Sequence, residues 1–193
     1  MKRFRYLLGS QSPRRKELLA AMDIDFECVA VKDIEEIYPD NLPAELVPEY
    51  LSKLKAEAYR SNLGSDDLLI TADTVVILDG EILGKPADEQ EAIEMIVRLS
   101  GREHDVVTGV TLSTSNKSVT FSDKTRVKFA RLGREEIEEY VKNYRPLDKA
   151  GAYGVQEWIG MVGVEKIDGC FYNVMGLPTP ALYRQLRLFS AEK

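Results

Sequence analysis

The chain of 193 residues alternates short apolar runs with amphipathic segments. The apolar runs are rich in β-branched residues, a composition that favours strands. They predict strands over residues 4–8, 26–31, 68–72, 74–78, 81–83, 106–113 and 119–130. Asp79 and Gly80 form a dipeptide typical of tight hairpin turns, so we expect the two strands around it to pair antiparallel.

Signals for the starts and ends of helices lie between these runs. Ser12 followed by Pro13 is typical of a helix N-terminus, and Thr179 followed by Pro180 repeats the pattern. A variant capping box opens at Asp88, and Gly101 predicts the end of that helix. The predicted helices begin after Ser12, cover residues 45–62, 88–100 and 134–143, and follow Thr179. The acidic segment 32–43 contains two prolines and is predicted to be a loop.

The end of the chain adds a further pair of apolar runs. Residues 161–167 and 170–174 flank a turn at Asp168 and Gly169, which predicts another hairpin. Because the pattern mixes hairpins with strand–helix units, we expect an α/β fold with a mixed sheet. No internal repeat or linker interrupts the sequence, so we expect a single domain over residues 1–193.

Composition and charge narrow the function classes. The chain is 44% hydrophobic and 30% charged, as ordinary globular proteins are. We expect no membrane span and no signal peptide, because the apolar runs are short and no cleavage-like site follows the basic N-terminus. Cys28 and Cys170 form no CxxC pair, which favours a reducing, cytoplasmic compartment. The net charge of −6 argues against duplex binding but is compatible with a small anionic substrate.

The segment from Ser10 to Arg15 joins the first predicted strand to the first predicted helix. Helix N–H groups and the helix dipole favour an anion at such a position. The two serine hydroxyls and two guanidiniums add to this preference, because the planar Arg fork can bond two phosphate oxygens at once. In the alternative interpretation Ser12 caps the helix, and Arg14 and Arg15 are solvated surface charges.

Asp73 interrupts an apolar run, between Ala72 and Thr74. A buried carboxylate is costly unless it is paired or has a function. Metal binding, general base catalysis and a position at a strand end that opens into a cleft all fit this residue. An aspartate at a strand end or bulge that bonds nearby backbone fits it equally well.

Two further candidates lie in predicted loops. Lys85 is held between Gly84 and Pro86 beside the predicted hairpin, or it is an ordinary surface lysine in a turn. Glu36, with Asp33 and Glu35, offers the oxygen ligands that Mg²⁺ takes, or it belongs to a solvated acidic loop.

Gln156 and His104 complete the candidates. Gln156 ends a run of small residues, and its amide can read the edge of a nucleotide base. In the alternative interpretation that run is a tight structural loop. His104 is the sole histidine, which excludes a histidine-rich metal site, and we interpret it as structural.

Together these segments resemble the Maf family of nucleotide pyrophosphatases. The matching pieces, in the family's order, are GSQSPRR, KAEA around Lys55, TADTVV, GKP, SGREHDVVTG, DKAGAYGVQ and VMGLP. Each piece is weak alone, but seven in order over nearly the whole chain are specific. The form DKAGAYGVQ resembles the branch of the family that acts on dTTP and UTP.

The resemblance implies a single α/β domain related in fold to the ITP pyrophosphatases. In that fold a long mixed sheet is flanked by helices and bears a deep central cleft. The implied reaction converts dTTP and UTP, and perhaps 5-modified UTP, to the monophosphate and pyrophosphate with Mg²⁺ or Mn²⁺. The resemblance also implies a homodimer. From the cysteines, the short apolar runs and the net charge we expect a cytoplasmic protein with no membrane and no stable nucleic-acid partner.

The resemblance also assigns roles to individual residues. The catalytic position, the proton acceptor for water, falls on Asp73. Positions that bind phosphate and select substrate fall on Ser10, Arg14, Arg15, Lys55 and Lys85. Thr74 and Gln156 match positions tied to base choice, and Glu36, with Asp73, matches positions associated with the metal. Lys53 and Glu35 are alternatives for the Lys55 and Glu36 positions.

A second function also follows from the resemblance. It is a regulator of septum formation that binds nucleotide or nucleic acid without hydrolysis, and so arrests cell division. The presence of Asp73 and the acidic net charge argue against binding alone.

Overall fold

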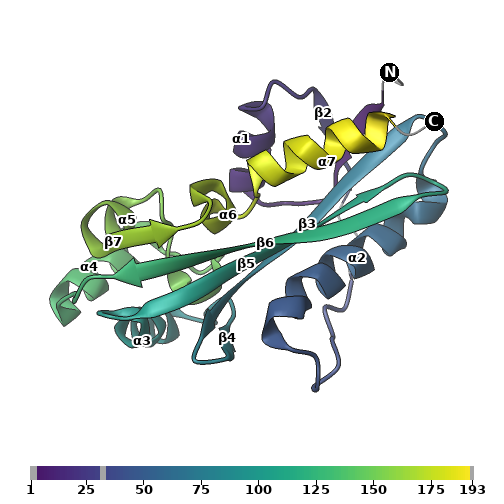
Figure 1. Ribbon diagram of the computed structural model, residues 1–193. Coiled ribbons are helices and arrows are strands. Elements are labelled where there is room, and N and C mark those ends of the chain that lie inside the picture. Colours follow the sequence, from purple (N-terminus) through teal and green to yellow (C-terminus); the bar gives the residue numbers. More distant parts are fainter. Residues whose placement is uncertain (1–3, 31–33, 192–193) are drawn as a thin grey trace. The chain divides into compact units, whose positions relative to one another are not determined.

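A computed structural model describes residues 4–30 and 34–191. This part of the chain contains a seven-stranded sheet of order β2-β1-β3-β5-β6-β7, with β4 paired to β3 (Figure 1). The strands are β1 (Arg5–Leu8), β2 (Phe26–Cys28), β3 (Asp67–Leu78), β4 (Glu81–Leu83), β5 (Glu103–Ser113), β6 (Ser118–Phe129) and β7 (Val164–Asp168). β1 runs parallel to β2 and β3, whereas β4 and β7 run antiparallel to β3 and β6. The predicted α/β class with a mixed sheet is confirmed.

Helices form where the start signals predict them. They are α1 (Pro13–Ala20), α2 (Val47–Tyr59), α3 (Glu89–Leu99), α4 (Arg134–Tyr144), α5 (Trp158–Gly163), α6 (Phe171–Met175) and α7 (Thr179–Ala191). Short 3₁₀ turns η1 (Ala44–Leu46) and η2 (Arg60–Asn62) extend α2 at both ends, and η3 covers Ala150–Ala152. Over the described ranges, no helix is both long and apolar enough to cross a membrane.

Contacts within the chain divide it into two compact units. The first comprises Met1–Asp73, Thr108–Asp123 and Gly176–Lys193, and the second comprises Thr74–Val107 and Lys124–Met175. Strands β3, β5 and β6 therefore supply residues to both units. The single domain over residues 1–193 and its deep central cleft stay predictions.

In the first unit, α2 packs against the strands. Leu7 of β1, Tyr59 of α2 and Leu69 of β3 form one buried apolar cluster. The start of α2 lies directly against β5 at Gly109, where a Cβ atom would be 2.3 Å from the carbonyl carbon of Pro48. Glycine is therefore the residue that permits this close approach of helix and strand.

In the second unit, α3 and α4 cover a larger apolar core. Val76, Ile96, Val106, Phe129 and Tyr140 come from five different elements and are all at most 2% exposed. The predicted cap of α3 forms, because the Asp88 carboxylate accepts the Glu91 N–H at 2.8 Å. In a capping box the Glu91 carboxylate would also accept the backbone N–H of the N-cap residue, Asp88. Here it accepts the N–H of the preceding residue, Ala87.

The hairpin predicted over residues 161–174 is wrong. Its first run divides between α5 and β7, and its second run forms α6. The backbone N–H of Cys170 donates to Thr125 Oγ1 at 2.9 Å, and the buried amide of Asn173 donates to the Val106 carbonyl at 3.0 Å. These bonds to β5 and β6 replace the ladder that a returning strand would form. Over so short a run, an apolar pattern does not separate strand from helix.

His104 lies inside the core of the second unit, as its structural interpretation predicts. Its ring packs edge-on against Phe129 and Tyr153, and its Nε2 atom is 2.7 Å from the Tyr153 hydroxyl. The Nδ1 atom is buried without a hydrogen-bond partner among the described residues. Burial lowers the pKa of His104 from 6.5 to about 4, against the weaker opposing effect of Asp105.

We predict that Gly109→Ala destabilises the first unit. The added methyl group would overlap backbone atoms of Pro48 and Glu49, which cannot rotate away as a side chain can. Overpacking of this kind costs about 1–3 kcal/mol or more in free energy of unfolding, measurable by urea denaturation. Gly84→Ala is the matched control, because no atom lies within 4 Å of a Cβ built there. Equal stability of the two variants would contradict the close approach.

We also predict a pH dependence of stability that comes from His104. The unfolded histidine takes up a proton near pH 6.5, whereas the folded one resists protonation down to about pH 4. Stability is therefore complete above the unfolded pKa and falls as the pH decreases through this window, by roughly 3 kcal/mol. Urea denaturation between pH 7 and pH 4.5 should show a flatter profile for His104→Gln. Parallel profiles for the wild type and the variant would exclude His104 as the source.

Candidate active site

Asp73 lies in the interior of β3. The two strands predicted on either side of it are one continuous strand, Asp67–Leu78, so the prediction of a strand-end or bulge position is wrong. Its neighbours Thr71 and Ala72 are buried, and the Asp73 side chain is only 13% exposed. A carboxylate in such a place requires a partner of opposite charge.

Lys55 of α2 is that partner. Its Nζ atom donates to Asp73 Oδ1 at 2.6 Å and lies 3.1 Å from Glu36 Oε1. The Lys55 side chain is 15% exposed, whereas that of Glu36 is 50% exposed. The structure therefore brings Lys55, Asp73 and Glu36 together. The alternatives Lys53 and Glu35 are exposed, and Asp33 lies outside the described residues.

Arg15 is held by the protein and is not a solvated surface charge. Its Nε atom donates to the Gly176 carbonyl at 2.8 Å, and Nη1 donates to the Ala72 carbonyl at 2.9 Å and to Ser10 Oγ at 3.2 Å. Three of its five N–H donors are thus taken by protein oxygens. Burial lowers the pKa of the Arg15 guanidinium, and the Asp73 carboxylate opposes this effect. A guanidinium remains protonated under such conditions.

Ser10 and Ser12 organise the turn that enters α1. Ser10 Oγ accepts the Ser12 N–H at 3.3 Å in addition to its bond from Arg15. Ser12 is the N-cap residue and α1 begins at Pro13, as predicted, but the Ser12 hydroxyl makes no capping hydrogen bond. Arg14 follows in the first helical turn and is half-buried.

A chain of buried hydroxyl groups fixes α2 on the sheet. Thr71 Oγ1 donates to the carbonyl of Ser52, one turn before Lys55, at 2.7 Å. Ser52 Oγ is 2.9 Å from Thr111 Oγ1, which is 2.9 Å from Thr120 Oγ1. Thr71 and Ser52 are fully buried. These bonds therefore fix the position of α2 along β3, and with it the place where Lys55 meets Asp73. The candidates drawn from sequence omit both residues, although Thr71 stands in the same TADT run as Asp73.

The other predicted site residues belong to the second unit. Lys85 is exposed, and Thr74 is half-buried in β3. The loop of Lys85 is tied to the segment that leads to Gln156, because the Gly84 carbonyl accepts the Gly151 N–H at 3.0 Å. Gln156 is itself half-buried, and its Oε1 atom is buried without a hydrogen-bond partner in the described part of the chain.

Within residues 4–30 and 34–191, no three His, Cys, Asp or Glu side chains gather as metal ligands. Asp73 and Glu36 form a pair of carboxylates joined by Lys55. Hydrogen bonds from the described residues leave Asp73 Oδ2 and Glu36 Oε2 open. Mg²⁺ is often held by one or two carboxylates together with substrate phosphates, so the oxygen donors fit that type of ion.

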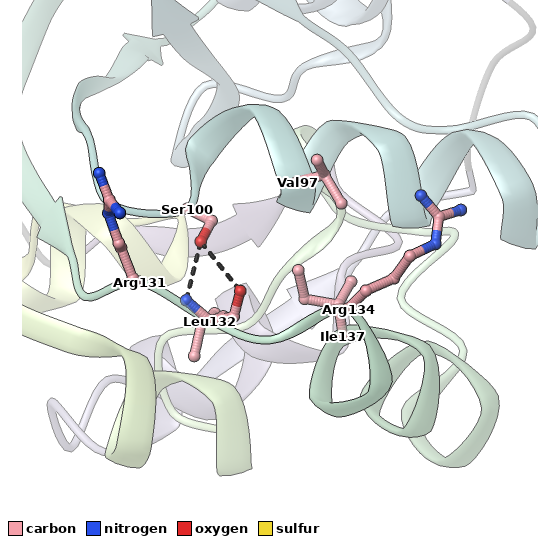
Figure 2. A pocket seen from close by; sticks show the side chains of 6 residues that line it. All are labelled: Val97, Ser100, Arg131, Leu132, Arg134 and Ile137. Carbon is pink, nitrogen blue, oxygen red and sulfur yellow. Dashed lines mark hydrogen bonds between the residues drawn. The ribbon is translucent and has the colours of Figure 1, made fainter.

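The pocket of Figure 2 contains none of the predicted site residues. It is lined by Val97, Ser100, Arg131, Leu132, Arg134 and Ile137. The Arg134 guanidinium is engaged by Glu94 and Glu138, and the Ser100 hydroxyl bonds the backbone of Leu132. Two of its three polar side chains already have partners and none of the predicted site residues lines it, so the candidate active site lies elsewhere.

Comparisons with known proteins agree with the sequence motifs. A family model described as Maf-like protein matches residues 5–189. A dTTP/UTP pyrophosphatase of Porphyromonas gingivalis (strain ATCC BAA-308 / W83) is 55% identical over 191 residues, 98% of this chain and 96% of that protein. A dTTP/UTP pyrophosphatase of Flavobacterium psychrophilum is 47% identical over 180 residues, 93% of this chain and 92% of that protein.

The solved structures support the fold. The Staphylococcus aureus Ham1 protein superposes with a TM-score of 0.55 at 17% identity, covering 98% of this chain and 100% of that one. A HAM1 protein from Coxiella burnetii gives 0.52 at 16% identity, covering 98% and 100%. At such low identity the likeness concerns the fold alone. The family model matches residues 5–189, and the relatives named above match more than nine tenths of the chain. The chain therefore belongs to the Maf-like protein family.

Proposed function

We propose that this chain hydrolyses dTTP and UTP, including 5-modified UTP, to the nucleoside monophosphate and pyrophosphate. Relatives at 47–55% identity carry the name dTTP/UTP pyrophosphatase. The observation that carries the proposal is the contact of Lys55 with both Asp73 and Glu36 in the unit that also holds Ser10 and Arg15. This arrangement offers a proton acceptor next to the cations that a polyphosphate requires.

Charge complementarity is the main chemical requirement of such a substrate. A triphosphate carries about four negative charges near neutral pH. In this proposal Arg14, Lys55 and Lys85 donate to its oxygens, while Arg15 mainly fixes the loop through its bonds to Ala72 and Gly176. Phosphoryl transfer depends mostly on positioning and on the stabilisation of charge, and these residues supply both.

Asp73 is the proposed base. The Lys55 ammonium holds Oδ1, so the carboxylate is fixed in orientation while Oδ2 has no hydrogen-bond partner among the described residues. Oδ2 accepts a proton from water as the water oxygen bonds to phosphorus. The phosphorus attacked is the α-phosphorus; its bond to the oxygen that bridges to the β-phosphorus breaks, and pyrophosphate leaves with that electron pair.

Asp73 and Glu36 are the residues that would hold a divalent cation. Glu36 Oε2 and the second lone pair of Asp73 Oδ1 would provide hard donors of the kind that Mg²⁺ and Mn²⁺ accept, so that Asp73 Oδ2 stays open for the proton. When bound, such an ion supplies positive charge to the phosphate oxygens and lowers the pKa of coordinated water.

Gln156 is the proposed reader of the base, with Thr74 as the second residue tied to base choice. The buried Oε1 atom is a hydrogen-bond acceptor without a partner in the described residues. Uracil and thymine present an N–H donor at ring position 3, whereas cytosine presents a bare acceptor nitrogen there. An amide oxygen in a fixed position therefore favours uracil and thymine over cytosine.

The assembly and location of the protein follow from the family resemblance. We include a cytoplasmic homodimer in the proposal. The regulator of septum formation without hydrolysis gains no support from the relatives, which are named as pyrophosphatases.

We predict that Asp73→Asn lowers kcat by about 10²–10⁴, because amide replaces the proton acceptor while shape is retained. The assay incubates each protein with UTP, dTTP, CTP and 5-methyl-UTP in the presence of Mg²⁺ or Mn²⁺. It resolves nucleotide products from pyrophosphate and orthophosphate. The wild type should release the monophosphate and pyrophosphate.

Asp79→Asn is the matched control for this variant. It makes the same change in the turn that follows β3, where Asp79 has a positive φ that asparagine also adopts. Its turnover should equal that of the wild type. Release of nucleoside diphosphate and orthophosphate would exclude the proposed reaction. Turnover by Asp73→Asn within about tenfold of the wild type would exclude Asp73 as the base.

We predict that Gln156→Ala alters the ranking of bases more than the rate on the best substrate. Removal of one selective hydrogen bond should reduce the preference for UTP over CTP by about tenfold, which corresponds to about 1.4 kcal/mol. The measurement is kcat/KM for the two nucleotides under identical metal concentration. An unchanged ratio would show that another residue reads the base.

A further inference from the structure

The segment that carries Gln156 is surrounded by a buried polar network in the second unit. The Tyr140 hydroxyl, from α4, donates to Glu157 Oε2 and accepts the backbone N–H of Gly154 at 3.0 Å. Lys149 Nζ lies 3.1 Å from Glu157 Oε1 and 2.8 Å from Asp148 Oδ1. Both carboxylate oxygens of Glu157 are thus engaged, one by a phenol and one by an ammonium group.

This network closes a turn around Gln156. The Glu157 N–H donates to the Gly154 carbonyl at 3.0 Å, so Gln156 is the third residue of a four-residue turn. A Cβ atom at the first position would lie 2.6 Å from the Glu157 carboxylate carbon, so a side chain there would displace the Glu157 carboxylate. Tyr140 holds both ends of the turn with a single hydroxyl group. The backbone of Gln156 is therefore fixed on both sides.

The Lys149 and Glu157 charges of the network are largely shielded from water, whereas Asp148 is exposed. The Lys149 side chain is 10% exposed and that of Glu157 is 19% exposed. A buried pair of this kind contributes little net stability compared with apolar residues of similar shape, although removal of one partner is costly. A fully hydrogen-bonded buried network of this kind instead restricts the turn to one geometry.

We propose that Tyr140, Glu157 and Lys149 are positioning residues for base selection, because they hold the Gln156 amide where it meets the base. This inference rests on the proposed function, in which Gln156 reads the base. The three residues do not contact the substrate. They act by keeping the Gln156 amide in one orientation, so that an incorrect base cannot be accommodated by a shift of the turn.

The test compares two tyrosine-to-phenylalanine variants. Tyr140→Phe removes the hydroxyl that bonds Gly154 and Glu157. Tyr153→Phe makes the same change within the same segment, but its hydroxyl bonds His104. Each variant leaves a buried polar atom without its partner, so both should unfold at a lower urea concentration than the wild type. Urea denaturation measures this shift.

Base selection should separate the two variants. We expect the kcat/KM ratio of UTP to CTP to fall about fivefold to tenfold in Tyr140→Phe and to remain within about twofold in Tyr153→Phe. A purely structural role of Tyr140 would lower stability without changing this ratio. If Tyr140→Phe fails to fold, Lys149→Met provides the same test, because it frees the other oxygen of Glu157.

The outcomes distinguish this inference from the proposed function. A fall in the ratio for Tyr140→Phe or Lys149→Met, with Tyr153→Phe unchanged, supports the positioning role. An unchanged ratio in Tyr140→Phe and Lys149→Met, with a reduced ratio in Gln156→Ala, overturns the inference and leaves the proposed function intact. An unchanged ratio in all of these variants overturns both the inference and the assignment of Gln156. Equal falls in Tyr140→Phe and Tyr153→Phe would indicate a general loss of packing and would also overturn the inference.

Discussion

The ion pair between Lys55 and Asp73 is the interaction on which the polar site of the first unit depends. Asp73 stands inside a strand among buried neighbours, where a carboxylate is tolerated only with a counter-charge. Lys55 can supply that charge at 2.6 Å only while α2 stays close to the sheet. Gly109 allows that approach because it has no side chain, and the bond from Thr71 to the Ser52 carbonyl fixes the height of the helix. Residues with no charge of their own therefore determine where the charges meet.

The parts of the fold that the sequence predicts are those with local causes. Asp79 and Gly80 both adopt positive φ, the backbone conformation that this dipeptide favours, and the predicted hairpin forms around them. Pro13 starts α1, and Asp88 caps α3, because each effect acts within one helical turn. The residues themselves indicate Asp73 and Glu36 as candidates and the family resemblance adds Lys55, and these three side chains do lie together.

The rest depends on partners that are remote in sequence. Nothing near Arg14 and Arg15 indicates which guanidinium will be held by the protein, because the acceptors of Arg15 are carbonyls of Ala72 and Gly176. The run 170–174 becomes α6 for a similar reason, since bonds from Cys170 and Asn173 to other strands replace the predicted ladder. In residues 170–174 local propensity is weak, so tertiary hydrogen bonds determine the secondary structure. For Arg15 they determine which side chain the protein holds.

Two buried polar atoms without hydrogen-bond partners in the described residues, His104 Nδ1 and Gln156 Oε1, show how the same local feature can have different consequences. His104 Nδ1 belongs to a side chain that is 3% exposed and packed between aromatic rings, so its effect is confined to the dependence of folding on pH. Gln156 is half-buried and its turn is closed on both sides, so the backbone that carries its buried Oε1 atom is held in place. An unsatisfied buried acceptor costs about 1–3 kcal/mol. A base with an N–H donor removes that cost on binding, whereas a base with a lone pair at the same place adds to it. In the proposed function, selectivity then comes from a group that the protein leaves unpaired, and we propose that its strength depends on how firmly Tyr140 and Glu157 prevent the turn from relaxing.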